Sequence, residues 1–145
     1  MLEISQGSID TNKYYSLWEK YARENNCGAY SIFVGVVRDE SNISALSFDI
    51  YLPILQNWFD KWQSKAKNNN AKIYMVHSSG DVEVGKVSFM CAIISPNRNV
   101  ALDLYDKFIE DFKQNAPIWK YDIKNGARIY ARERSKLIQG AGILQ

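Results

Sequence analysis

The spacing of the apolar residues constrains this chain more than any other feature, because it alternates between a helical and an extended period. Apolar side chains recur every three or four residues in three segments, which is typical of one face of an amphipathic helix. These segments follow Asp10, cover residues 52–66, and run from Arg98 to the Ala116-Pro117 step. The sequence therefore predicts three main helices.

The remaining segments are rich in β-branched and aromatic residues, which favour strands. Residues 28–37 carry apolar side chains on both alternating sets, as a central strand does, and Asn125-Gly126 suits a two-residue hairpin turn. Ser79-Gly80-Asp81 predicts a second turn. Further strands are expected at residues 46–50, 72–77, 87–94, 118–123 and 127–131. Because hairpins pair antiparallel strands, the predicted fold class is α+β with a mostly antiparallel sheet.

Composition narrows the class of protein. The 145 residues, 46% of them hydrophobic, suffice for one core, so we expect a single domain over residues 1–145. A net charge of +2 does not suit a nucleic-acid partner, and no apolar run is long enough to span a membrane. The first residues lack the pattern of a secretion signal, and the two cysteines lie far apart. We therefore expect a cytoplasmic protein.

Few residues suit metal or thiol chemistry, since the chain has one histidine and two cysteines. His77 and Cys91 lie in apolar strands, and we interpret both as structural. Lysine is the remaining candidate for proton transfer, because its surroundings can bring its pKa towards neutrality. Lys113 ends the third helix and Lys120 begins a strand. From these positions alone, a helix-dipole partner is the favoured interpretation of Lys113, and an exposed edge-strand charge is the commoner case for Lys120.

Two arginines suit a small anionic ligand. Arg38 follows the two-sided strand, at a sheet rim where its guanidinium can hold a phosphate through two hydrogen bonds; a solvated loop arginine is the alternative. Arg98 begins the third helix beside Asn97, and the backbone amides of a helix start favour anions. Asn97 also suits a simple N-cap.

Several segments together resemble the large-subunit family of molybdopterin synthase. They are Gly28-Ala29 leading to Phe-Val-Gly-Val-Val-Arg at residues 33–38, His77 with Gly80 and Gly85, and Ala116-Pro117-Ile118-Trp119-Lys120. The resemblance covers roughly residues 28–133, and its segments are far more specific together than singly. It implies an α/β hammerhead-like fold and a homodimer flanked by two ubiquitin-like small subunits in a heterotetramer. It implies no metal and no cofactor.

The resemblance also implies a reaction. The small subunit of that family carries sulfur as a thiocarboxylate on a flexible Gly-Gly tail. The large subunit uses this sulfur in two transfers to convert cyclic pyranopterin monophosphate (precursor Z) to molybdopterin, with opening of the cyclic phosphate. The family's two essential lysines match Lys113 and Lys120, whose charges are expected to stabilise an acyl-linked intermediate while one lysine moves protons.

The same resemblance assigns the substrate side of the site. Phe33 and Arg38 match the aromatic residue and the arginine that the family places near the pterin phosphate, and Arg98 matches a second phosphate-side arginine. Asn97 stands where the family usually has histidine, so it can hydrogen-bond an anion but offers no imidazole. Arg132, in an Ala-Arg-Glu segment, matches the family after a one-residue deletion. A flexible tail is expected from about residue 134.

Two other classes of function compete with this one. The first is a homodimeric binding module that docks the tail of a ubiquitin-like protein without catalysis, and Asn97 is its best support. Such a module would tolerate Lys120→Ala, whereas an enzyme would lose turnover and keep its partner. The second is an enzyme of unrelated chemistry acting on another small molecule.

Overall fold

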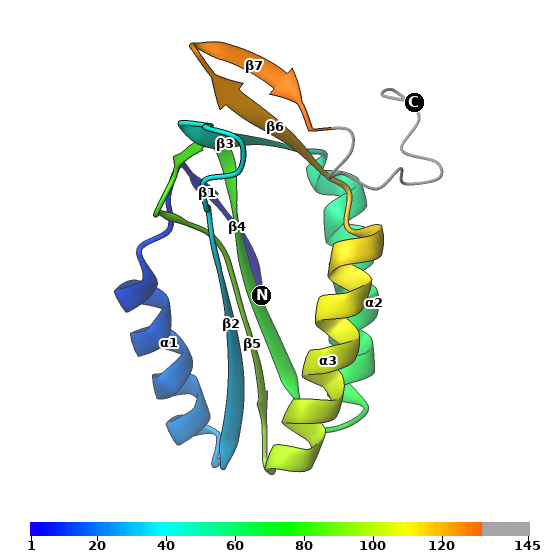
Figure 1. The fold of residues 1–145 in the computed structure, drawn as a ribbon. Helices are drawn as coiled ribbons and strands as arrows, with labels where there is room; N and C mark the ends of the chain where they lie inside the picture. The colour runs from blue at the N-terminus through cyan, green and yellow to red at the C-terminus, as the bar shows by residue number, and fades with distance from the viewer. Residues whose placement is uncertain (132–145) are drawn as a thin grey trace.

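The computed structural model describes residues 1–131, in which three helices accompany seven strands (Figure 1). The helices are α1 (Thr11–Glu24), α2 (Leu52–Lys67) and α3 (Arg98–Asn115). The strands are β1 (Leu2–Gln6), β2 (Ala29–Val36), β3 (Ala45–Ile50), β4 (Lys72–Glu83), β5 (Val87–Ser95), β6 (Ile118–Lys124) and β7 (Ala127–Tyr130). Within this part of the chain no helix is long and apolar enough to cross a membrane.

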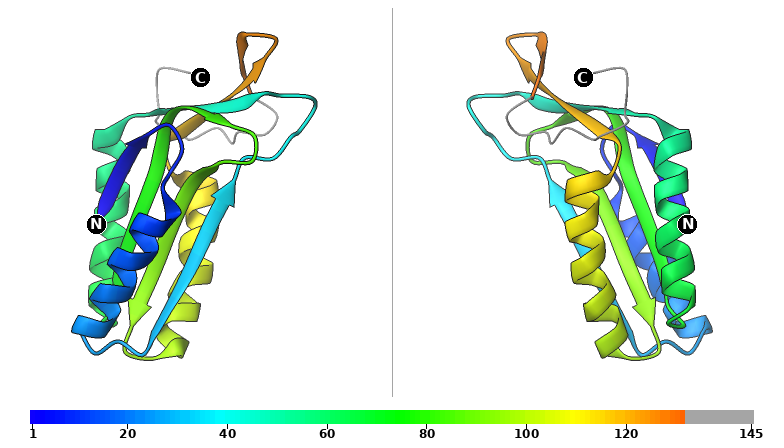
Figure 2. Two further views of the ribbon diagram at one scale, coloured as in Figure 1. Left: turned by 90° about the vertical axis from the view of Figure 1, so that its left-hand side faces the viewer. Right: turned by 90° about the vertical axis from the view of Figure 1, so that its right-hand side faces the viewer.

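All the strands belong to one sheet in the order β2-β5-β4-β3-β6-β7, with β1 beside β4. Every pairing is antiparallel except that of β1 with β4. Helix α1 covers one face of the sheet, whereas α2 and α3 lie side by side on the other (Figures 1 and 2). The predicted α+β class with three main helices is confirmed.

The helix ends follow local signals in the sequence. The Asp10 carboxylate accepts hydrogen bonds from the backbone amides of Asn12 and Lys13, which caps the start of α1 as predicted. Helix α3 stops at Asn115, two residues before Pro117, whose ring cannot continue a helix. The predicted hairpin turn at Asn125-Gly126 is also confirmed, since both residues have the positive φ of a type I′ turn.

The predicted turn at Ser79-Gly80-Asp81 is wrong. Strand β4 runs through these residues, and the turn to β5 comes later, around Gly85. Gly80 has a φ of +77°, and it lies where β4 ends its pairing with β5 and begins its pairing with β3. The glycine therefore bends one long strand between two parts of the sheet rather than reversing the chain.

Strand β1 was not predicted. It is five residues long, and it pairs with β4, a strand far along the chain. Its two larger apolar side chains, Leu2 and Ile4, pack against the core beneath α2 and α3. A local pattern this short gives a weak strand signal, and its pairing with a distant segment supplies the stabilisation.

A carboxylate joins the two helices on the shared face of the sheet. The indole N–H groups of Trp58 and Trp62, on α2, both donate to one oxygen of Asp111 on α3, at 2.8 and 2.6 Å. Asn115 donates to the other oxygen. Partial burial raises the pKa of Asp111, but hydrogen bonds from Trp62, Asn115 and Trp58 outweigh this and lower it. These bonds hold the last turn of α3 against α2.

Replacing Asp111 with alanine should lower the free energy of unfolding by about 2–4 kcal/mol, because two partly buried indole N–H groups lose a charged acceptor. Urea unfolding at neutral pH measures the loss. Asp103→Ala is the matched control, since the Asp103 carboxylate on the same helix is 61% exposed and pairs with Lys107. The control should cost less than about 1 kcal/mol. Equal losses in the two variants would contradict the role of the indole contacts.

Candidate active site

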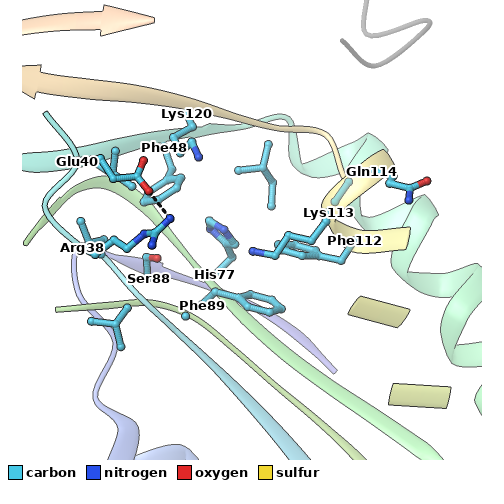
Figure 3. A pocket seen from close by; sticks show the side chains of 16 residues that line it. Arg38, Glu40, Phe48, His77, Ser88, Phe89, Phe112, Lys113, Gln114 and Lys120 are labelled. Carbon is cyan, nitrogen blue, oxygen red and sulfur yellow. Dashed lines mark ion pairs between the residues drawn. The ribbon is translucent and has the colours of Figure 1, made fainter. Parts of the chain in front are cut away.

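A cavity of about 340 Å³ lies at the C-terminal end of α3, where the sheet bends (Figure 3). Three separate parts of the chain bring cationic side chains to it: the loop after β2, the end of α3, and β6. The lining residues are Gly35, Val36, Val37, Arg38, Glu40, Leu46, Phe48, His77, Ser88, Phe89, Phe112, Lys113, Gln114, Ala116, Ile118 and Lys120. The site is therefore a basin that combines aromatic side chains with polar and charged ones.

The cavity lies where the cover that α3 gives to the sheet comes to its end. Along the helix-covered face of β4, Ile73 and Met75 are buried in the core under α2 and α3, and His77 is the next side chain on that face. At this level Phe112, in the last turn of α3, packs against His77 and Phe89, and the helix ends three residues later at Asn115. Phe89 pairs with both His77 and Gly35, and Gly35 adds no side chain to this part of the cavity lining.

Lys113 reaches the cavity from the last turn of α3. Its ammonium lies 5.6 Å from the centre of the Phe33 ring and 5.8 Å from that of Phe112, within range of cation–π attraction to both. In Figure 3 its side chain points from the helix towards His77. Phe33 does not line the cavity itself. Its described contribution is the contact of its ring with the Lys113 ammonium.

Lys120 enters from the opposite wall. It lies on β6, paired with Phe48 of β3, and its carbonyl accepts a hydrogen bond from the amide of Ala131. The side chain of Lys120 points into the space above Phe48 and His77 (Figure 3). A cation on a strand of the sheet and a cation on a helix end thus face the same basin.

Arg38 follows β2 and borders the cavity on a third side. Its guanidinium is 2.6 Å from a carboxylate oxygen of Glu40, and its side chain is 83% exposed. An anion at this rim would meet a guanidinium that is accessible and only partly neutralised by an acidic neighbour. This geometry suits a phosphate group at the mouth rather than at the floor.

Sequence analysis gave His77 no site role, but the structure places it on the cavity floor. The residue is only 4% exposed, and its ring lies against those of Phe48, Phe89 and Phe112. Burial is the main reason that the pKa of His77 falls to about 4; the Ser78 carbonyl raises it slightly, and Lys113 lowers it further. The sequence signal for this position is a polar residue that follows apolar residues at alternate positions of the same strand.

Asn97 and Arg98 do not reach this cavity within one chain. They begin α3, whereas Lys113 ends it, which separates them by roughly 22 Å at 1.5 Å per residue. The Asn97 side chain accepts from the Val100 amide, so the N-cap interpretation is confirmed. Arg132 and the predicted tail from about 134 lie outside the described residues.

Cys91 is fully buried, and burial raises the pKa of its thiol to about 12, which agrees with its interpretation as an unreactive core residue. Among residues 1–131, no three His, Cys, Asp or Glu side chains lie close enough together to hold a metal ion. The polar groups available for chemistry at the cavity are therefore lysine, arginine, histidine, amide and serine side chains, with Glu40 at the rim.

A family model described as MoaE protein matches residues 4–115, which is most of the chain. The chain belongs to the MoaE family. A Helicobacter pylori protein (strain 26695) named molybdopterin synthase catalytic subunit is 51% identical over 144 residues, 99% of both chains. Its namesake from strain J99 is 43% identical over the same share. The resemblance noted in the sequence is thereby confirmed.

Solved structures agree with the family assignment. One described as a protein–protein complex of subunits 1 and 2 of molybdopterin-converting factor from Helicobacter pylori 26695 matches with a TM-score of 0.94. It is 50% identical and covers 99% of both chains. Molybdopterin synthase from Staphylococcus aureus matches with a TM-score of 0.74 over 88% of this chain and 94% of that one, but at 22% identity it supports only the fold. The MoaE fold is thus shared at full length.

The buried imidazole should make stability depend on pH. The unfolded chain binds a proton at His77 below about pH 6.5, whereas the folded chain binds it only near pH 4. The free energy of unfolding should therefore fall by about 2 kcal/mol between pH 7.5 and pH 5 through this group alone. Urea unfolding of the parent and of His77→Phe at both pH values tests this. Parallel pH curves for the two proteins would contradict it.

Proposed function

We propose that this chain is the catalytic subunit of a molybdopterin synthase and converts cyclic pyranopterin monophosphate (precursor Z) to molybdopterin. The observation that carries the proposal is the meeting of Arg38, Lys113 and Lys120 around one cavity, from three parts of the chain. The sequence predicts each of these three residues to belong to the site, although they lie far apart in the chain. The likeness to catalytic subunits over nearly the whole length supports the same reaction.

The cavity suits a flat heterocycle that carries a phosphate. Phe48, Phe89 and Phe112 supply an aromatic floor and wall on which such a ring can pack. The exposed guanidinium of Arg38 at the rim is the candidate phosphate ligand. Phe33 contributes indirectly, because its ring contacts the Lys113 ammonium.

The two lysines are the proposed catalytic residues. In each transfer, the thiocarboxylate sulfur of the small subunit bonds to a side-chain carbon of the pterin precursor, and a carbon–oxygen bond at that carbon breaks. The oxygen leaves on the opened cyclic phosphate in one transfer and as water in the other, and each transfer gives an acyl-linked intermediate. Water then cleaves the acyl–sulfur bond and returns the tail as a carboxylate. Lys113 and Lys120, on opposite walls, stabilise the negative charge that develops on the acyl oxygen, and one of them delivers or removes the proton. Two such cycles supply the two sulfurs without a metal or cofactor.

The proposed sulfur-supplying partner is a ubiquitin-like small subunit. The similar Helicobacter pylori structure, described as a complex of subunits 1 and 2 of molybdopterin-converting factor, supports a second subunit as partner. We further propose that the chain is a homodimer within a heterotetramer. Strand β2 is an edge of the sheet, and Tyr30 and Val36 on it are exposed. Antiparallel pairing of two β2 strands would extend the sheet across a two-fold axis.

Such a dimer would also explain Arg98. The start of α3 lies at the Ala29 end of β2, because Ala29 pairs with Ser95, whereas the cavity lies at the Val36 end. Two antiparallel β2 strands bring the Ala29 end of one protomer to the Val36 end of its partner. Arg98 and Asn97 would then serve the site of the partner rather than their own, with Asn97 still capping its helix.

The non-catalytic binding module remains the competing function, with Asn97 in place of the family's histidine as its support. The continuous sheet supports the prediction that residues 1–145 form one domain. A cytoplasmic location, a contribution from Arg132, and a flexible tail from about 134 also stay predictions from sequence.

Lys120→Ala should reduce molybdopterin formation by about two orders of magnitude or more, because one of the charges opposite the acyl group is lost. The assay supplies cyclic pyranopterin monophosphate and thiocarboxylated small subunit, and it measures small-subunit binding in parallel. Lys124→Ala, on the same strand but outside the cavity lining, is the matched control. Lys113→Ala should behave like Lys120→Ala, with Lys107→Ala as its control on α3. Full turnover by Lys120→Ala with normal partner binding would favour the binding module.

Mixed dimers test whether Arg98 acts across the two-fold axis. Arg98→Ala and Lys120→Ala homodimers should each be nearly inactive. Random mixing of the two chains should restore about one quarter of the parent activity, because half of the dimers are mixed and each contains one intact site. Absence of any recovery, with mixed dimers demonstrated by differential tagging, would show that activity needs Arg98 and Lys120 on the same protomer and would contradict action across the two-fold axis.

A further inference from the structure

His77 is a polar side chain on the cavity floor that the proposed chemistry does not use. It is 4% exposed, and three aromatic rings surround it, with centroid distances of 5.0 Å to Phe48, 5.7 Å to Phe89 and 5.9 Å to Phe112. A purely structural residue at this position would more simply be apolar, as Ile73 and Met75 are in the same row. The reason for a histidine at this position should therefore lie in the nitrogen atoms of its imidazole.

One of its two nitrogens is already engaged. Nδ1 lies 2.8 Å from the carbonyl oxygen of Ser78, and a carbonyl can only accept, so Nδ1 carries the hydrogen and donates it. In a neutral imidazole, Nε2 is then without a hydrogen and presents a lone pair. Because the pKa of His77 is lowered to about 4, the ring is neutral across the working pH range of most enzymes.

The imidazole of His77 lines the cavity. Within residues 1–131 no hydrogen bond of its Nε2 is described, whereas Nδ1 is engaged by the Ser78 carbonyl. The open space at this residue is the cavity, and Figure 3 shows the ring between Arg38 and Lys113.

The charged groups that face His77 from the surrounding elements are mostly donors. They are Lys113 from α3, Lys120 from β6, and Arg38 with Glu40 from the loop after β2, while β3 and β5 present Phe48, Phe89 and Ser88. The Glu40 carboxylate is held by Arg38 at the rim. A ligand can place its anionic group against the cations, but an N–H or O–H group at the floor needs an acceptor, and Nε2 is positioned to be one.

We propose that Nε2 of His77 accepts a hydrogen bond from an N–H or O–H group of the bound pterin precursor, which makes His77 a substrate-binding residue. The identity of the ligand rests on the proposed function. A pterin ring carries N–H and amino donors along its edge, and its flat faces match the aromatic rings around His77. The phosphate remains at the rim near Arg38, so the two contacts would orient the heterocycle within the basin.

The test compares variants that differ in acceptor capacity. His77→Phe keeps a ring among the aromatic neighbours but removes the acceptor, whereas His77→Gln restores an acceptor oxygen. Met75→Leu, in the same row beneath the helices, controls for loosened packing. Binding of cyclic pyranopterin monophosphate is measured by calorimetry at pH 7 on the full complex, with thermal unfolding to verify folding. Should His77→Phe unfold, His77→Met, matched to Gln in length, replaces it.

The dissociation constant should rise by about tenfold or more in His77→Phe, since a ligand donor is left unpaired, and His77→Gln should recover most of this loss. Met75→Leu should bind as the parent does. Unchanged binding by His77→Phe, with or without a lower kcat, would overturn the proposal and leave the proposed function intact. If only kcat falls, the Nε2 lone pair would be assigned to an interaction with Lys113. A parent complex that neither binds nor converts the precursor would overturn the function and this proposal with it.

Discussion

The end of α3 at Pro117 is the constraint on which the site depends. Because proline cannot continue the helix, α3 stops at Asn115, three residues after Phe112, whose ring packs on Phe89 and His77. The chain then turns at once into β6, which carries Lys120. The stop of α3 before Pro117 therefore places Lys113 at one wall of the cavity and starts the strand that forms the opposite wall.

Two other features fix the position of the C-terminal end of α3. Asp111 ties the last turn of α3 to two tryptophans of α2 through hydrogen bonds to a single carboxylate oxygen. Gly80 bends β4 so that the same strand pairs with β5 below the cavity and with β3 above it. The lysines thus stand on elements whose relative position is set by packing and strand pairing, which favours the preorganisation that electrostatic catalysis needs.

The site combines donors with a buried neutral acceptor. Arg38, Lys113 and Lys120 would repel one another in a dry pocket, but the described geometry spreads them over three walls, with Glu40 beside the arginine and aromatic faces beside Lys113. A positively charged histidine on the floor would add to this repulsion. Burial and the neighbouring Lys113 keep His77 neutral, so the basin retains one lone pair among its cations.

The sequence by itself determined the three helices, the Asn125-Gly126 hairpin, the caps at Asp10 and Asn97, and the family, because these depend on local periodicity, capping chemistry and ordered motifs. It did not determine β1, the continuation of β4 through Gly80, or the place of His77, because each depends on a pairing with residues distant in the chain. A glycine between polar residues has the same local signature in a turn and in a bent strand. A histidine in an apolar strand looks structural, and only the tertiary structure decided that its imidazole lines the cavity beside Lys113, because that contact joins segments distant in the chain.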